Sequence, residues 1–400
     1  MSGSAAGTAL AEGSRPVRPR GPVRVVAAAV GTVLLVAMIF WARMLAGGDG
    51  VLWPLLVGVV TAGWIVAAAV GRSSAGRTVL AALVAALLAP ILVLAGGFGW
   101  LAVEGSGGPG AATRGGDALW MGHAWVDGRR GPADVDALAA LVRETGIRDL
   151  YVHAGPFADD GTLDPTLRPS ARWLVEAVHA AAPGVRVQAW LGNVVADDRL
   201  RLDDPATRAR VLQGVRAVLA DGFDGVHYDF EPVASGNAAY LELLTATRAV
   251  TRASGAILSA AVNQVEMVAG MHLPGQLAFG RPHWWSFDYF AAVAREVDQV
   301  AMMSYDTGVP FEIAYSGYVA VQTRLATQAV PDGVELLMGV PAFRDGVMHT
   351  GAETVAAAVR GIRVGLGAAP DRPVGAAVYV DFDATEADWA QYRSGWAEAG

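Results

Sequence analysis

The chain has 400 residues, 53% of them hydrophobic, and its mean hydropathy of +0.37 is high for a purely soluble protein of this length. It has no cysteine and no lysine, which excludes disulfide frameworks, thiolate metal sites, cysteine nucleophiles and all chemistry that needs a lysine amine. Residues 104–400 carry 23 arginines and 36 acidic residues, a net charge of −13, so we expect no nucleic-acid partner.

Three uncharged apolar stretches lie in the first quarter of the chain, at residues 25–42, 51–71 and 78–103. About 20 helical residues cross the hydrocarbon core of a bilayer, so each stretch is long enough to span it. We therefore predict three transmembrane α-helices with the lipid bilayer as a partner. A cleavable signal peptide is the alternative for the first stretch, because arginines precede it.

The arginines of this region predict its orientation. Four of them precede residue 25, and Arg72 and Arg77 occupy the turn between the second and third stretches. Short arginine-rich segments stay in the cytoplasm, which places the N-terminus inside and everything after residue 103 outside. We expect a multi-pass protein of the cell membrane with a cytoplasmic tail (1–24), a three-helix membrane anchor (25–103), a flexible Gly/Ala/Ser-rich linker (104–116) and an extracellular domain (117–400).

In the domain that starts at residue 117, short β-branched or aromatic runs alternate with alanine- and arginine-rich stretches of helical period. We predict strands near 119–126, 149–153, 186–191, 225–230, 257–262, 299–305, 335–340 and 375–382. We predict helices near 132–144, 169–181, 205–220, 237–254, 287–295, 314–329, 353–365 and 386–398. Eight such units indicate an α/β fold, the (β/α)8 TIM barrel. An open doubly wound sheet is the alternative, but no glycine-rich phosphate turn follows the first strand.

The fourth predicted strand carries the candidate catalytic residues. Chemistry in a TIM barrel takes place at the C-terminal ends of the strands. Side chains alternate along a strand, so His227, Asp229 and Glu231 share the inward face while Tyr228 and Phe230 point outward. Two carboxyl groups this close in a partly buried mouth raise the pKa of one of them, which suits a general acid.

This strand resembles the DxxDxDxE signature of the family 18 glycoside hydrolases, the chitinases and endo-N-acetylglucosaminidases. Asp224, Asp229 and Glu231 match the signature, and His227 stands where the family has its middle aspartate. A second segment on the sixth strand, Met303-Ser304-Tyr305-Asp306, resembles the MxYD element of that family. The family's tryptophan near the end of strand eight is missing here, and Tyr379 and Asp381 lie in that region.

The resemblance implies a membrane-anchored glycosidase for β-linked N-acetylhexosamine glycans, such as chitin or cell-envelope polysaccharides. Glu231 would protonate the glycosidic oxygen while the acetamido carbonyl of the substrate attacks the anomeric carbon, with net retention. Asp229 would orient and stabilise the acetamido group, and Tyr305 would donate a hydrogen bond to its carbonyl. Asp306 and Met303 would shape the floor of the site. No cofactor is expected.

Other side chains at the strand ends and in the loops are candidate substrate contacts: His227, Trp125, Trp284, Asn263 and Asp381. For His227, a packed histidine inside the barrel is the competing interpretation. Two other functions stay open. One is a carbohydrate-binding, lectin-like barrel. The other is a metal-dependent hydrolase with ligands among His123, His227, Asp229 and Asp381.

Overall fold

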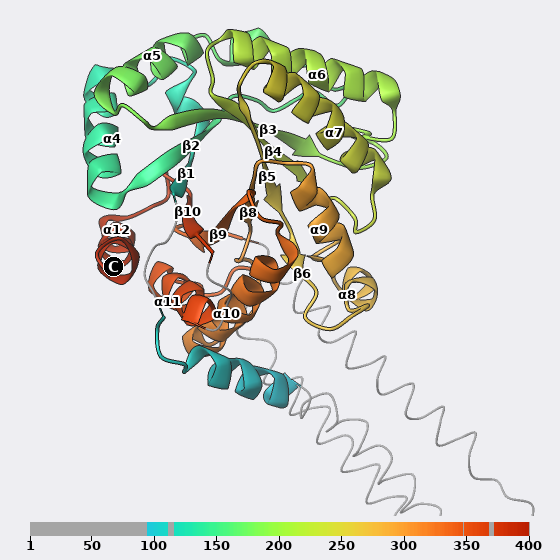
Figure 1. Ribbon diagram of the computed structural model, residues 1–400, viewed down its shortest axis with the longest axis vertical. Coiled ribbons are helices and arrows are strands. Elements are labelled where there is room, and N and C mark those ends of the chain that lie inside the picture. Colours follow the sequence, from blue (N-terminus) through green and yellow to red (C-terminus); the bar gives the residue numbers. More distant parts are fainter. Residues whose placement is uncertain (1–93, 111–115, 347, 368–371, 400) are drawn as a thin grey trace, which may run out of the picture. The chain divides into compact units, whose positions relative to one another are not determined.

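The computed structural model describes residues 94–110, 116–346, 348–367 and 372–399. Eight parallel strands close into a barrel in the order β1-β10-β9-β8-β5-β4-β3-β2, and the helices surround it (Figure 1). The barrel strands are β1 (Asp117–Met121), β2 (Ile147–His153), β3 (Arg186–Val194), β4 (Gly225–Glu231), β5 (Ile257–Val262), β8 (Gln299–Met302), β9 (Glu335–Pro341) and β10 (Val374–Tyr379). The predicted α/β barrel is therefore confirmed.

The helices between the strands bury their apolar faces against the outside of the barrel. They are α4 (Pro132–Thr145), α5 (Ala171–Ala181), α6 (Pro205–Ala220), α7 (Ala238–Ala253), α9 (Phe287–Arg295), α10 (Glu312–Ala329), α11 (Val355–Gly367) and α12 (Glu386–Tyr392). Several begin at side-chain caps: Asp204 accepts from the backbone N–H groups of Ala206 and Thr207 ahead of α6, and Asn237 caps α7. These caps explain why the predicted helix starts agree closely with the structure.

The segment between β5 and α9 contains elements that periodicity does not predict. Gln264–Val265 (β6) and Trp284–Trp285 (β7) form a separate two-stranded parallel sheet, and α8 (His272–Phe279) lies between them. Two-residue strands and an eight-residue helix are too short to produce a clear hydrophobic period. The insertion matters for function because it supplies part of the wall of the candidate site.

Residues 94–105 are helical and pack against the barrel domain. Leu101 is buried, Glu104 forms an ion pair with Arg324 at 2.5 Å, and Arg360 donates to the carbonyl of Gly105 at 3.0 Å. Glu104 and Gly105, at the start of the predicted linker, therefore contact the domain. Residues 111–115 lie outside the described residues.

The predicted membrane helices fall largely outside the part of the chain that the structure describes. The stretches 25–42 and 51–71 lie wholly outside it, and only 94–103 of the third stretch lies within it. Within the described ranges, no helix combines the length and the apolar character needed to cross a bilayer.

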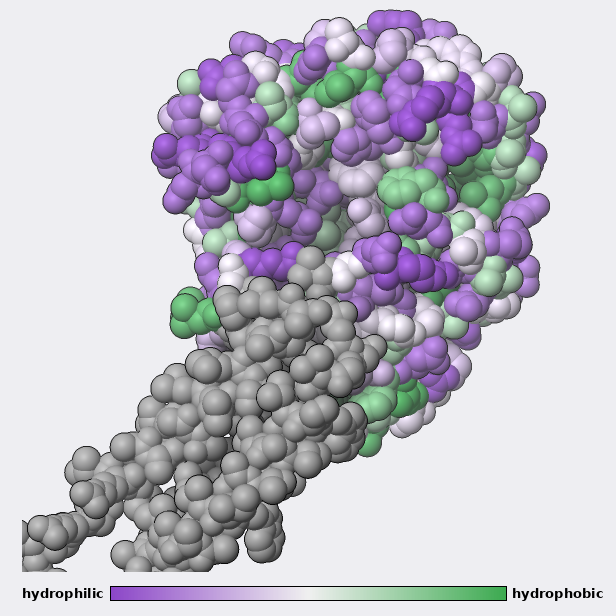
Figure 2. All heavy atoms as spheres, turned by 180° about the vertical axis from the view of Figure 1, so that it is seen from behind, coloured by the Kyte–Doolittle hydropathy of each residue, from purple (hydrophilic) through white to green (hydrophobic). Residues whose placement is uncertain are grey.

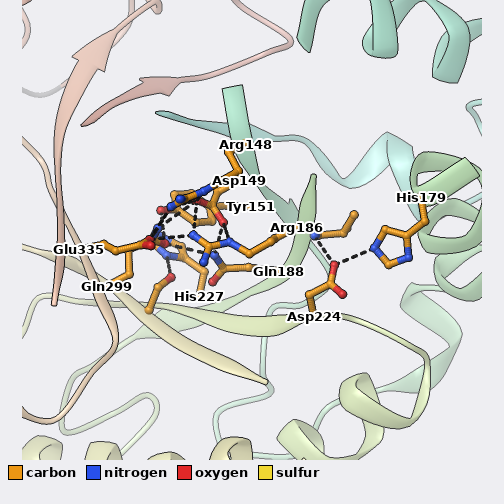
Figure 3. Close-up of polar contacts among 12 residues, drawn as sticks. Arg148, Asp149, Tyr151, His179, Arg186, Gln188, Asp224, His227, Gln299 and Glu335 are labelled. Atoms are coloured by element: carbon orange, nitrogen blue, oxygen red, sulfur yellow. Dashed lines mark hydrogen bonds and ion pairs between the residues drawn. The ribbon is translucent and has the colours of Figure 1, made fainter. Parts of the chain in front are cut away.

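A buried polar network fills the N-terminal end of the barrel (Figure 3). Arg186 donates two hydrogen bonds to the Asp149 carboxylate, at 2.5 and 2.6 Å, and a third to Glu335 at 2.7 Å. Gln299 donates to both carboxylates and accepts from the Tyr151 hydroxyl at 2.7 Å. Paired and hydrogen-bonded in this way, the charges are compatible with burial, and they close this end of the barrel.

On the face shown in Figure 2, hydrophilic residues predominate and hydrophobic ones occur in separate groups. A cavity opens at the mouth of the barrel, at the C-terminal ends of the strands.

Candidate active site

The alternation predicted for β4 is confirmed. Tyr228 and Phe230 belong to the hydrophobic layer between the strands and the helices, whereas His227 and Asp229 contact aromatic side chains inside the barrel. Asp224, just before β4, accepts from the backbone N–H of Val187 and pairs with His179 (Figure 3). Asp224 therefore joins β4 to its neighbours, and β4 carries the two candidate catalytic carboxyl groups towards the mouth.

Asp229 lies inside the mouth against β3. The indole N–H of Trp190 donates to its Oδ2 at 2.9 Å, while its Oδ1 is buried without a hydrogen-bond partner in the described part of the chain. A Cβ on Gly192 would lie 1.9 Å from the Asp229 carbonyl oxygen, so a residue other than glycine would clash with β4 at this point of β3. Burial raises the pKa of Asp229 to about 6, although the Trp190 hydrogen bond lowers it.

Glu231 is the last residue of β4, and its side chain is exposed at the mouth. The surrounding cavity wall desolvates its carboxyl group, and the nearby Asp229 carboxylate repels a second negative charge, so the pKa of Glu231 rises to about 8. Arg281 opposes this shift. The pKa values of both carboxyl groups are thus raised, that of Glu231 further than that of Asp229, which favours Glu231 as the proton donor of the pair.

His227 lies beneath this pair and is fully buried. Its Nε2 accepts from the indole N–H of Trp120 at 3.0 Å, and Nδ1 is 2.6 Å from the Ser259 hydroxyl. The ring stacks on Tyr151 with the ring centroids 3.8 Å apart. The Trp120 bond leaves the proton on Nδ1, and burial holds the pKa of His227 well below its usual value. The expectation that His227 contacts substrate is corrected: it is a neutral, packed side chain below the cavity.

Tyr305 follows β8 and faces the same mouth. Gln264 fixes the chain here by donating to the carbonyl groups of Met303 and Tyr305, at 2.9 and 2.8 Å. A Cβ on Gly339 would lie 2.8 Å from the Tyr305 ring, so glycine makes room for that ring on β9. Tyr379 stacks on Tyr305 with the centroids 5.4 Å apart. Tyr379 thus supplies an aromatic floor at the end of β10.

A cavity of about 440 Å³ opens at this end of the barrel. Six of the sequence-predicted residues line it: Asp229, Glu231, Tyr305, Asp306, Met303 and Asn263. Residues that sequence reasoning did not name as site residues also line it, among them Trp120, Gln264, Arg281, Phe343, Asp345 and Phe382, and so does Tyr379 at the end of β10. The cavity therefore contains the carboxyl pair, an aromatic floor and one arginine.

Trp125 and Asp381 do not line the cavity, because they bind each other. β1 ends at Met121, and the 3-10 turn His123–Trp125 directs the Trp125 indole N–H to Asp381 Oδ2 at 2.6 Å. Asp381 Oδ1 accepts from the backbone N–H of Gly122 at 2.8 Å. Both oxygens of Asp381 thus accept hydrogen bonds from the segment that follows β1. Trp125 and Asp381, which we expected to contact substrate, instead bind each other.

Trp284 also lies outside the cavity. Its indole N–H donates to the Tyr318 hydroxyl at 2.8 Å, and its ring covers Gly275, where a Cβ would lie 2.6 Å away. The side chain attaches α8 and the small sheet to α10. The expectation that Trp284 stacks on a sugar is therefore replaced by a packing role.

The four ligands of the metal-hydrolase alternative do not converge. Both ring nitrogens of His227 have partners, and both oxygens of Asp381 accept hydrogen bonds from Trp125 and Gly122. His123 instead lies beside His153, with their Nδ1 atoms 3.3 Å apart. The geometry thus gives no support to a metal-activated water at Asp229.

Solved structures with similar folds include chitinases and a cortex-lytic enzyme. A chitinase from Chromobacterium violaceum ATCC 12472 is 16% identical with a TM-score of 0.50, over 71% of this chain and 99% of that one. The spore cortex-lytic enzyme SleL of Bacillus cereus is 14% identical with a TM-score of 0.49, over 72% of this chain and 76% of that one. No protein-family model and no curated protein sequence matches the chain. At 16% identity, the similarity to the Chromobacterium violaceum chitinase shows the barrel fold alone.

Proposed function

We propose that the barrel domain is a glycoside hydrolase of the family 18 type that cleaves β-linked N-acetylhexosamine glycans by substrate-assisted, retaining catalysis. The observation that carries the proposal is the carboxyl pair at the end of β4. Asp229 and Glu231 line one cavity with Tyr305, and their pKa values are raised to different extents. The two sequence elements that resemble family 18 supply these three residues.

In the proposed reaction, Glu231 donates its proton to the glycosidic oxygen as the bond to the anomeric carbon breaks. The acetamido carbonyl oxygen of the same sugar forms the new bond to that carbon, giving an oxazolinium ion. Asp229 accepts the acetamido N–H on its unpartnered Oδ1 and stabilises the positive charge. Glu231, now a carboxylate, removes a proton from a water molecule that attacks the anomeric carbon. The bond between that carbon and the acetamido oxygen breaks, the acetamido group is restored, and the configuration is retained.

The remaining cavity residues position the sugar. The Tyr305 hydroxyl donates to the acetamido carbonyl and directs its attack, while the rings of Tyr305 and Tyr379 form an apolar floor. Asp306, Met303 and Asn263 line the wall and are the further proposed contacts. The proposed contacts do not include His227, Trp125, Trp284 and Asp381, because these side chains bind other residues and do not line the cavity.

The test is Glu231→Gln in the full-length chain. The amide is nearly isosteric but cannot deliver a proton, so hydrolysis of an N-acetylglucosamine oligomer should fall by at least about 10²- to 10⁴-fold. The loss should be smaller for an activated aryl glycoside, whose leaving group needs little protonation. Asp229→Asn should reduce the hydrolysis of both substrates, because it affects the oxazolinium ion.

An unchanged rate for Glu231→Gln on the oligomer would refute the assignment. Oligomer binding without hydrolysis by the wild-type chain would favour the lectin-like alternative.

We also propose that the apolar stretches before residue 94 anchor the chain in the cell membrane, with the N-terminus in the cytoplasm and the barrel outside. The support is the length of the three uncharged stretches and the arginines around them. Protease added to intact spheroplasts should remove the barrel and leave a membrane fragment of about the first hundred residues. A barrel that is degraded only after the membrane is lysed would refute this orientation.

A further inference from the structure

Three potential metal ligands meet beside the substrate cavity. Asp306 follows β8, while His349 and Glu353 lie in the segment between β9 and α11. One ligand atom from each side chain lies within 4.8 Å of the other two. In the described part of the chain, no other group of three or more such side chains has this geometry.

Two of these atoms are buried without hydrogen-bond partners among the residues described. The His349 side chain is only 6% exposed, and its Nδ1 makes no hydrogen bond, although it lies 3.4 Å from Glu353 Oε2. Oδ1 of Asp306 is also buried and unpartnered. Buried polar atoms in native proteins are almost always satisfied, so two unsatisfied atoms from different segments in one place indicate a missing partner.

Glu353 is held in position for the same partner. Its Oε1 accepts from the backbone N–H and the hydroxyl of Thr307, both at 2.8 Å, and its Oε2 accepts from the backbone N–H of Asp306 at 2.7 Å. Three donors orient the carboxyl group, and Oε2 retains a lone pair. Metal-binding carboxylates are typically oriented by such outer hydrogen bonds.

We propose that Asp306, His349 and Glu353 bind a divalent transition-metal ion of the zinc type. Two ligand atoms each about 2.1 Å from a tetrahedral zinc ion lie about 3.4 Å apart. His349 Nδ1 and Glu353 Oε2 are 3.4 Å apart. One imidazole nitrogen with two carboxylate oxygens suits zinc, whereas calcium and magnesium prefer oxygen ligands alone. The ion connects the end of β8, next to Tyr305, to the segment that carries Asp345 of the cavity wall.

The test measures zinc binding by the purified full-length chain, prepared without a histidine tag and stripped with a chelator. After dialysis against zinc chloride, wild type should retain one more zinc ion per chain than His349→Ala. Titration calorimetry should show at least about 100-fold weaker binding at this site in the variant. His272→Ala is the matched control, because His272 contacts Glu266 at 2.6 Å without a third ligand, and it should bind zinc like wild type.

Circular dichroism in the presence of chelator verifies that the variants are folded. If His349→Ala is unfolded, His349→Gln, which keeps most of the side-chain volume, replaces it. Zinc should raise the melting temperature of wild type and not that of the glutamine variant. Equal zinc content in wild type and the His349 variants, or no zinc in wild type, would overturn the proposal and leave an ion pair between His349 and the carboxylates.

Discussion

The hydrogen bond from Trp190 to Asp229 controls the acidic limit of the proposed activity. Asp229 must be ionised to stabilise the oxazolinium ion, and Glu231 must be protonated to act as the acid. The pair should therefore give a bell-shaped pH profile of kcat/KM with apparent pKa values of about 6 and about 8. We predict that Trp190→Phe moves the acidic limb to higher pH.

The size of this shift follows from the contact. The Trp190 indole N–H lies 2.9 Å from Asp229 Oδ2, and a hydrogen bond to a charged group contributes about 1.5–3 kcal/mol. One pKa unit corresponds to about 1.4 kcal/mol, so complete loss of the bond would raise the pKa of Asp229 by about 1–2 units. Water entering from the mouth replaces part of the bond, which reduces the expected shift to about one unit.

The assay is the pH dependence of kcat/KM on an activated aryl N-acetylglucosaminide. The acidic limb should move from about 6 towards about 7, while the basic limb stays near 8. Trp284→Phe is the matched control, because it removes an indole hydrogen bond of 2.8 Å outside the cavity. The reasoning is refuted if the acidic limb of Trp190→Phe coincides with that of wild type, or if Trp284→Phe shifts it equally.

Two further substitutions test the cavity wall and the packing of the helix at residues 94–105 against the barrel domain. Arg281→Met removes the positive charge that lowers the pKa of Glu231, so the basic limb of the same profile should move to higher pH; a basic limb that moves to lower pH would contradict this. Gly317→Ala places a Cβ 1.8 Å from the Leu101 carbonyl oxygen, so we expect about 1–3 kcal/mol of destabilisation and a lower melting temperature. Gly351→Ala, whose Cβ meets nothing within 4 Å, should melt like wild type.

The barrel could be predicted from the sequence because each strand and helix carries its own local signal. Pro205, Asn237 and Ser286 mark helix starts, and the buried strands are short apolar runs. The insertion after β5 could not be predicted in this way. α8 is short and apolar, and the two-residue strands β6 and β7 are defined only by their pairing with each other.

The positions of site residues on the strands could be predicted, because the alternation along a strand determines where each side chain points. The positions of residues beyond the strand ends could not be predicted in this way. Asp229 and Glu231 are on β4, so their shared direction follows from the backbone. Trp125 and Asp381 follow strands that end earlier than expected, and their mutual hydrogen bond determines where they point. Arg281 comes from an irregular segment with no local signal that would place it in the cavity.

Alternate residues of β3, like those of β4, face the interior of the barrel. The inward position of Trp190 could therefore have been inferred in the same way as that of Asp229. This alternation does not identify the hydrogen-bond partner of Trp190. That an indole N–H reaches Asp229 depends on the register of β3 against β4 and on the space left by Gly192.

The histidine below the carboxyl pair has a consequence for how protons are exchanged at the site. His227 donates through Nδ1 to Ser259 and accepts through Nε2 from Trp120, so neither nitrogen can exchange a proton with Asp229. His227 therefore offers Asp229 no proton relay towards the barrel interior. In the proposed reaction the water that attacks the anomeric carbon returns the proton to Glu231, so this water must enter through the open mouth while the oxazolinium ion is bound.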